Sequence, residues 1–273
     1  MPYAINNGVR IYYEVEGQGR PLVLGHGGSD TLEMWRKSGY ADALKDEFRL
    51  VLFDLRGHGR SDGMPLHGNE SSGGNQREIP DRRTGMSDDV VAILDNLGID
   101  KAYYFGYSAG AKVGYDLALH HGDRFHGFIL GGMTPYVWPE TMVKAVNISI
   151  DLYKMLLAEP EQYLFRMERL LGRPLTPEDR EHFLAQDAEA RIAGLTALID
   201  GPVLTDRELA QISTPCLVFC GDLDPFHPGA LEGARHMSRV RFLSLPGLNH
   251  ISAIMRNDLV VPYVKEFLYK IQR

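Results

Sequence analysis

Short apolar runs that alternate with helical patterns are the feature that most constrains the fold of this chain. Such runs, hydrophobic without polar alternation, are typical of parallel strands that are covered by helices on both faces. Strands that alternate with helices in this way predict an α/β fold. The runs that predict strands are 21–25, 49–54, 102–106, 127–131, 216–221 and 240–245, and the helical patterns are 31–44, 87–97, 108–120 and 259–271.

Two segments stand outside this rhythm. Near the start of the chain, Asn7-Gly8 lies between extended runs and predicts a two-residue β-hairpin turn. From about 136 to 204 apolar residues recur at helical spacing with no strand between them, and five prolines divide the segment into three or four helices. We therefore expect a core of residues 1–135 and 205–273 with a helical cap inserted at 136–204.

Residues 63–85 form a long stretch rich in Gly, Ser and Asn, with few aliphatic residues. This composition predicts a loop. Loops beyond about 15 residues in a compact domain are either functional lids or disordered excursions, and both alternatives stay open.

Composition narrows the class of partner. The chain has 29 Lys and Arg against 36 Asp and Glu, a net charge of −7, and no clustered basic face that would predict nucleic-acid binding. It has no apolar window of about 18 residues and no N-terminal signal layout, so we expect neither a membrane span nor secretion. The expected partner is a small-molecule substrate, with a homodimer as an open possibility.

The two cysteines, Cys216 and Cys220, lie in one predicted strand. Four residues of extended chain span about 13 Å, which is too far for a disulfide. No further ligands stand nearby at metal-binding spacing. We expect two core thiols, no metal site and a reducing cytoplasmic location.

The sharpest chemical signal is Gly106-Tyr107-Ser108-Ala109-Gly110, between a predicted strand and a predicted helix. A serine on such a tight turn needs very small residues two before and two after it. The turn exposes the hydroxyl and places the Ala109 N–H at a helix N-terminus, where it can donate to an oxyanion. We predict that Ser108 is a nucleophile; the alternative is a merely structural turn.

A serine nucleophile needs a base and an acid that orients it. His250 follows the strand run 240–245, and Asp222 and Asp224 follow the run 216–221. Loops at the carboxyl ends of parallel strands surround the site in α/β sheets, so these residues can meet Ser108. We predict His250 as the base and Asp224 as the acid, with Asp222 bonded within its own turn.

In these motifs the chain resembles the α/β-hydrolase family over nearly its whole length. The chain order Ser, Asp, His is that of the family. The resemblance implies a mostly parallel eight-stranded sheet with helices on both faces and an inserted cap. His26-Gly27-Gly28 is similar to the family's H-G-x loop, which implies that the Gly28 N–H is a second oxyanion donor. Residues 54–62 (DLRGHGRSD) match the family's D-x-R-G-x-G-x-S turn, so we expect His26 and His58 to be structural.

The chain also departs from common family patterns. Many esterase-like members have S-M-G-G at the elbow, whereas this chain has Ser108-Ala109-Gly110-Ala111. Members that cleave epoxides or haloalkanes have an aspartate nucleophile, so Ser108 argues against both activities. Residues near the motif loops or at the start of the insertion could line an apolar pocket. They are Trp35, Tyr107, Met133, Tyr136 and Trp138, and the alternative for each is packing in the core or the cap.

The sequence thus predicts a serine hydrolase of a small or medium carboxylic ester, lactone or related acyl compound, without a cofactor. Two alternatives stay open. One is a hydrolase of carbon–carbon bonds in vinylogous diketones, which the same triad and cap serve in the family. The other is a slow-turnover ligand receptor on the same fold.

Overall fold

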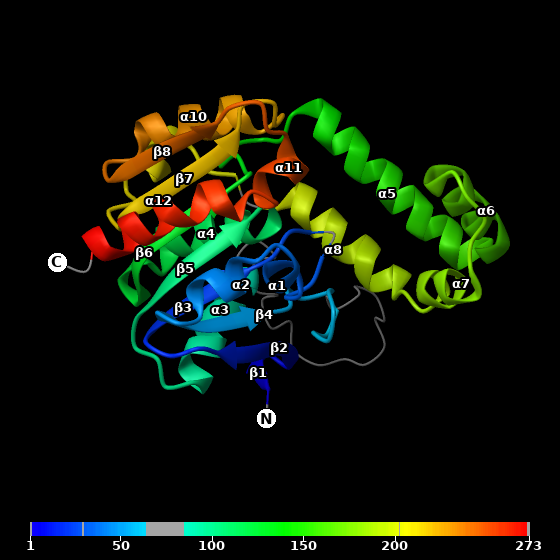
Figure 1. The fold of residues 1–273 in the computed structure, drawn as a ribbon, viewed down its shortest axis with the longest axis horizontal. Coiled ribbons are helices and arrows are strands. Elements are labelled where there is room, and N and C mark those ends of the chain that lie inside the picture. The colour runs from blue at the N-terminus through cyan, green and yellow to red at the C-terminus, as the bar shows by residue number, and fades with distance from the viewer. Residues whose placement is uncertain (1, 29, 64–84, 202, 272–273) are drawn as a thin grey trace, which may run out of the picture.

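Eight strands form a single sheet in the order β1-β2-β4-β3-β5-β6-β7-β8 (Figure 1). The computed structural model describes residues 2–28, 30–63, 85–201 and 203–271. β1 and β2 are antiparallel to their neighbours, and the other strands pair in parallel. The expected mostly parallel, eight-stranded sheet is confirmed. The strands are β1 Tyr3–Asn6, β2 Val9–Glu16, β3 Arg20–Gly25, β4 Phe48–Phe53, β5 Ala102–Tyr107, β6 Phe125–Gly131, β7 Cys216–Gly221 and β8 Val240–Leu245.

The predicted hairpin joins β1 to β2. Asn6 pairs with Val9, and the two turn residues both have positive φ, 48° at Asn7 and 84° at Gly8. Positive φ at both central positions is what a type I′ turn requires, and Asn-Gly adopts it most readily. The hairpin prediction is confirmed.

Helices cover both faces of this sheet (Figure 1). α3, α4 and α10 pack on one face, and α1, α2, α11 and α12 pack on the other. The helices of the core are α1 Met34–Lys37, α2 Tyr40–Leu44, α3 Gly85–Asn96, α4 Ala109–His120, α9 Asp206–Leu209, α10 His227–His236, α11 His250–Ile254 and α12 Asn257–Lys270, with a 3-10 turn at Gly122–Arg124.

Two hydrophobic clusters, one on each face, explain the continuous apolar runs. Successive residues of a central strand alternate between the clusters: Val23 and Tyr104 belong to one, Leu24 and Phe105 to the other. All four side chains are fully buried. Burial of such a side chain contributes about 1.5–3 kcal/mol, so both faces of each central strand stabilise the fold.

The pattern at 31–44 predicted one helix, and this prediction was wrong in one respect. The segment holds two short helices, α1 and α2, separated at Gly39. Gly39 has φ 78°, a left-handed conformation that ends α1 and that an L side chain rarely adopts. A side chain there would also meet the amide of Asn257. The break lets α2 turn back against the sheet.

Five helices lie between β6 and β7 in the described part of the chain, and four of them project beyond the sheet (Figure 1). They are α5 Glu140–Ala158, α6 Pro160–Leu171, α7 Pro177–Leu184 and α8 Ala188–Asp200. Pro160 and Pro177 each lie in the first turn of a helix, where the missing N–H costs nothing. At the base of this insertion the Leu204 N–H donates to the Pro135 carbonyl, 2.8 Å away. The assignment of 136–204 as a cap domain stays a prediction.

Several other expectations concern the surface and the thiols. Cys216 and Cys220 are buried and free, and burial raises the pKa of Cys216 to about 12.

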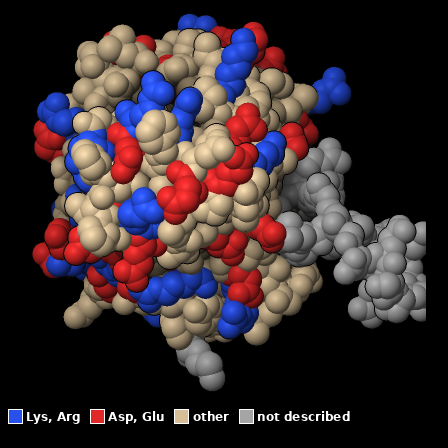
Figure 2. Space-filling view, turned by 90° about the vertical axis from the view of Figure 1, so that its right-hand side faces the viewer, with Lys and Arg blue, Asp and Glu red and all other residues tan. Residues whose placement is uncertain are grey.

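Figure 2 shows acidic and basic side chains intermixed over the face that bears the insertion, without one dominant basic patch. None of the helices within the described ranges is both long and apolar enough to cross a bilayer. The predicted loop at 63–85 lies, apart from its two end residues, outside the described residues.

The turn after β4 is built around the buried carboxylate of Asp54. Its Oδ1 accepts the Leu32 N–H at 2.8 Å and its Oδ2 the Arg60 N–H at 2.9 Å. Within the same turn, Arg56 Nε donates to Asp89 Oδ2 at 2.7 Å, and this pair is buried between the turn and α3. The turn thus ties β4 to elements far away in sequence.

His26 and His58 are both buried and bond to backbone groups. The Leu55 N–H donates to His26 Nε2 at 3.0 Å, so the imidazole proton is on Nδ1, which donates to the Gly27 carbonyl at 2.7 Å. His58 Nε2 lies 2.7 Å from the Gly28 carbonyl oxygen. Burial lowers the pKa of both imidazoles, most strongly for His26. Their placement supports a structural role.

Replacement of Arg56 by Met should lower the free energy of unfolding by about 3–5 kcal/mol, because it leaves Asp89 buried without its cation. Urea unfolding measures this loss. Arg10→Met, which breaks the exposed Arg10–Asp62 pair, is the matched control and should leave the free energy of unfolding nearly unchanged, because water screens this pair. Equal losses in the two variants would contradict the special weight given to the buried pair.

The lowered pKa of His26 makes the fold sensitive to acid. Below about pH 6.5 the unfolded chain binds a proton at this residue that the folded chain does not, so stability falls as the pH drops. Between pH 7 and 5 this group removes up to about 2 kcal/mol. Urea unfolding at both pH values should show a smaller decrease for His26→Gln than for wild type. His182→Gln, at an exposed histidine, should keep the wild-type decrease; a similar decrease in all three proteins would refute the assignment.

Candidate active site

Ser108 occupies a strained turn between β5 and α4. Its φ is 52° and ψ is −113°, outside the regions that L residues favour. A side chain at Gly106 would overlap the Gly110 carbonyl, and one at Gly110 would overlap the Gly25 carbonyl of β3. Glycine is therefore required two residues before and two after Ser108, as the sequence indicates.

His250 connects Ser108 to Asp224. Its Nε2 lies 3.0 Å from Ser108 Oγ, and its Nδ1 lies 2.7 Å from Asp224 Oδ2. With the proton on Nδ1, the imidazole donates to the carboxylate and accepts from the serine hydroxyl. The three side chains form a continuous hydrogen-bonded row at the carboxyl ends of β5, β7 and β8.

The carboxylate of Asp224 is buried and fixed in orientation. Its Oδ1 accepts the Phe226 N–H at 3.0 Å, which leaves Oδ2 for the imidazole. Asp222 was expected to bond within its own turn, and this prediction was wrong: its Oδ1 accepts the Gly247 N–H at 2.7 Å, in the loop before His250. The two aspartates thus hold different groups, and of the two it is Asp224 whose carboxylate bonds to the imidazole.

The imidazole of His250 is held on both sides. The Tyr107 hydroxyl donates to the His250 carbonyl, and the Tyr107 ring centroid lies 5.4 Å from that of the imidazole. The Phe226 ring meets it edge-on at 5.5 Å. Asn249 caps α11 and accepts the Ile251 and Ser252 N–H groups. Packing and capping together limit the rotation of the His250 imidazole.

Gly28 and Ala109, the expected oxyanion donors, lie next to each other. A Cβ on Gly28 would be 3.5 Å from Ala109 Cβ. Ala109 is the first residue of α4, whose first N–H groups have no partner inside the helix. The bond from His26 to the Gly27 carbonyl fixes the peptide plane that carries the Gly28 N–H. Both N–H groups lack an acceptor among the described residues, so a substrate oxygen could accept from both.

The five predicted pocket residues take different positions. Trp138 meets the Phe226 ring at 5.1 Å and so reaches the site through that ring. Tyr107 packs on the imidazole of His250. Trp35 is fully buried between Tyr40 and Phe105 in the core.

The remaining two pocket candidates lie at the base of the insertion. Met133 is buried in the core cluster that includes α4. The Tyr136 hydroxyl donates to Asp206 Oδ1 at 2.6 Å, at the start of α9. For all five residues a role in substrate binding stays a prediction.

Two residues near Ser108 were not predicted from the sequence. Lys112 lies one turn after Ser108 in α4, and a lysine in an otherwise apolar, buried helix is a signal that the sequence contains. Leu198 of α8 has no sequence signal, because it is one of many leucines in the insertion. No group of three His, Cys, Asp or Glu side chains suited to hold a metal occurs in the part of the chain that the structure describes.

Residues 20–252 match a family model described as the alpha/beta hydrolase fold. The chain is 30% identical over 227 residues to a pimeloyl-acyl-carrier-protein methyl ester esterase of Aeromonas hydrophila, covering 78% of this chain and 81% of that protein. A solved enol-lactonase of Burkholderia xenovorans LB400 superposes with a TM-score of 0.72 at 25% identity, covering 98% of this chain and 100% of the other.

A RutD protein of Caulobacter sp. (strain K31), whose name assigns it to carbamate hydrolysis, is 35% identical over 128 residues. That match covers 44% of this chain and 41% of the relative's length. The match of the family model, in contrast, extends from β3 to α11 and takes in every motif of the site. The chain therefore belongs to the α/β-hydrolase fold family.

Proposed function

We propose that this protein is a serine hydrolase that cleaves a small or medium carboxylic ester, lactone or related acyl substrate. The observation that carries this proposal is the hydrogen-bonded row from Asp224 through His250 to Ser108, at 2.7 and 3.0 Å. Relatives named as a methyl ester esterase and an enol-lactonase support the same class of acyl chemistry.

In the proposed reaction, Ser108 Oγ attacks the substrate carbonyl carbon while His250 Nε2 takes the hydroxyl proton. The carbonyl oxygen becomes an oxyanion and accepts the N–H groups of Gly28 and Ala109, and one such donor typically contributes about 3–4 kcal/mol to the transition state. The protonated imidazole then gives its proton to the leaving alkoxide, and an acyl-enzyme on Ser108 remains.

Deacylation repeats these steps with water as the nucleophile. His250 takes a proton from the water that attacks the acyl carbon, the second oxyanion collapses to release the carboxylic acid, and Ser108 Oγ leaves and receives the proton from His250. Asp224 stays ionised throughout, holds the imidazole in one tautomer and stabilises the imidazolium. Every group in this cycle comes from the chain itself, so the mechanism uses no cofactor.

We also propose a role for the helical insertion and a location for the protein. The helices of 136–204 act as the cap that closes over a small-molecule substrate. The location we propose is the cytoplasm, in keeping with the two free, buried thiols.

The nucleophile can be tested by covalent labelling. A small alkyl fluorophosphonate should add one adduct mass to the wild-type protein, located at Ser108 by peptide mapping, because only an activated serine reacts. Ser108→Ala should show no adduct and no ester turnover, with an unchanged melting temperature. An adduct at another serine, or full turnover by the variant, would refute the proposal.

The role of the acid can be tested by Asp224→Asn. The amide should favour the wrong tautomer of His250 and lower kcat by about 10⁴-fold, with the fold intact. Asp222→Asn is the matched control, since this carboxylate bonds to Gly247 and not to the imidazole. We expect the control to retain kcat within about tenfold; comparable losses in both variants would show that the two carboxylates are not distinguished in this way.

A further inference from the structure

Helix α8 returns from the insertion directly over the proposed oxyanion donors. The Leu198 side chain is buried, and its Cδ2 lies 3.0 Å from where a Cβ on Gly28 would be. The same point is 3.5 Å from Ala109 Cβ. Leu198 therefore packs against Gly28, next to the side chain of Ala109.

The approach of α8 depends on a small residue one turn earlier. A Cβ on Gly194 would lie 3.3 Å from His58 Cε1, which is tighter than ordinary contact. His58 in turn bonds to the Gly28 carbonyl through Nε2. The face of α8 that carries Gly194 and Leu198 thus lies along the loop that contains Gly28.

Lys112 holds the C-terminal part of α8 against α4. Its Nζ donates to the Leu198 carbonyl at 2.7 Å, close to the C-terminus of α8, where a cation is favoured. The ammonium also lies 5.2 Å from the centroid of the Trp138 ring. Because Lys112 belongs to the first turns of α4, this bond joins the helix that follows Ser108 to the backbone of Leu198.

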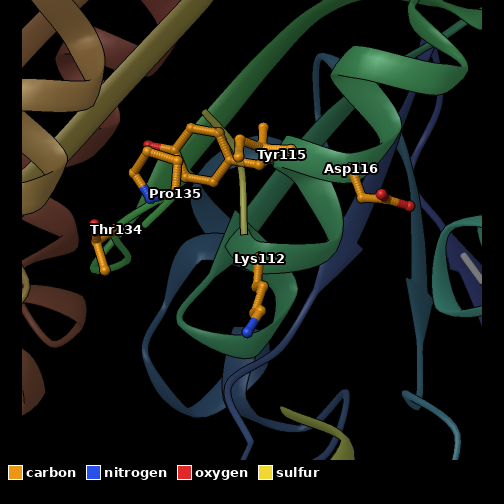
Figure 3. Close-up of a pocket in the computed structure, with 6 residues that line it drawn as sticks. Lys112, Tyr115, Asp116, Thr134 and Pro135 are labelled. Carbon is orange, nitrogen blue, oxygen red and sulfur yellow. The ribbon is translucent and has the colours of Figure 1, made fainter. Parts of the chain in front are cut away.

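The environment of Lys112 is costly for an ammonium group. The side chain is buried and its ammonium donates to a neutral carbonyl, while the negative charge of Asp200 in the last turn of α8 favours the charged form. Burial lowers its pKa to about 8. Figure 3 shows that Lys112 leaves α4 in a different direction from Tyr115, which extends toward Pro135. Lys112 is one of the residues that line the small cavity beside Thr134 and Pro135, and its ammonium bonds to the Leu198 carbonyl of α8.

We propose that Leu198 sets the size of the acyl group that the site accepts, and that Lys112 is the positioning residue that holds Leu198 over the oxyanion donors. This inference rests on the function proposed above. A carbonyl oxygen bound by the Gly28 and Ala109 N–H groups must lie about 3 Å from both. The carbon chain attached to that carbonyl then passes within contact of Leu198, so long or branched acyl groups meet its methyl groups.

The first experiment measures kcat/KM for p-nitrophenyl acetate, butyrate, isobutyrate and octanoate. Leu198→Ala should raise the octanoate-to-acetate ratio by about tenfold or more, because a lost contact of this size in a hydrophobic pocket changes discrimination by 10- to 200-fold. Leu164→Ala is the matched control, since Leu164 is buried in a cluster formed within the insertion itself. The control should keep the wild-type ratio, and an unchanged ratio in Leu198→Ala would overturn the proposal.

The second experiment tests the positioning role. Lys112→Met keeps an unbranched apolar stem of four atoms but removes the donor nitrogen, and it should shift the acyl ratio toward that of Leu198→Ala. Amide hydrogen exchange across α8 should become faster, which is a readout independent of activity. Lys112→Arg restores a donor and should recover both values. In the Leu198→Ala background, Lys112→Met should cause no further shift, because it acts through Leu198.

Failure of the two proposals can be told apart. If the fluorophosphonate labels wild-type Ser108 but the octanoate-to-acetate ratio is the same in wild type, Leu198→Ala and Lys112→Met, only the role of these two residues is overturned. If wild-type Ser108 stays unlabelled and no ester is turned over, the proposed function fails and this inference fails with it.

Discussion

The close approach of α4 to β3 is the constraint on which the rest of the site depends. No side chain fits between them at Gly110, and this absence lets the chain reverse sharply after β5. The reversal holds Ser108 at a positive φ and places Ala109 at the start of the helix. His250 and Asp224, which come from loops far along the chain, then meet a hydroxyl whose position is already set.

Buried polar groups hold this arrangement in place through backbone contacts. Asp54, His26 and His58 bond mostly to main-chain N–H and carbonyl groups, so they fix loops and not side chains. His26 is fully buried and neutral, and its two ring nitrogens are both satisfied. Such networks stabilise one loop conformation, because each unsatisfied buried group would cost about 1–3 kcal/mol. The loop at Gly28 thus takes its shape before any substrate arrives.

Much of the fold and the central row of side chains could be predicted from the sequence. Apolar runs identified the parallel strands because both faces of each are buried, and Ser108 was evident because its turn demands glycines at fixed offsets. His250 and Asp224 followed from their places after strands, since the carboxyl ends of parallel strands share one edge. The break at Gly39 and the short helices α9 and α11 were missed, because a single left-handed residue or one capped turn leaves little periodicity.

Other features of the site depend on tertiary contacts that have no local pattern. Leu198 is unremarkable within its helix, and it matters only because α8 crosses Gly28. Trp35 follows a motif loop in sequence, yet it packs in the core against Phe105.

The hydrogen bond between Leu204 and Pro135 closes the base of the helical insertion, and the chain leaves and returns between two strands that are neighbours in the sheet. An excursion that begins and ends at one point can be lengthened, shortened or exchanged without a change in strand order. Strand order therefore does not limit the insertion, but its contacts do, because Trp138 and Leu198 belong to the core cluster that includes α4. A different helical segment grafted between Pro135 and Leu204 would keep the strand order, and it would have to replace the packing of Trp138 on Phe226 beside His250.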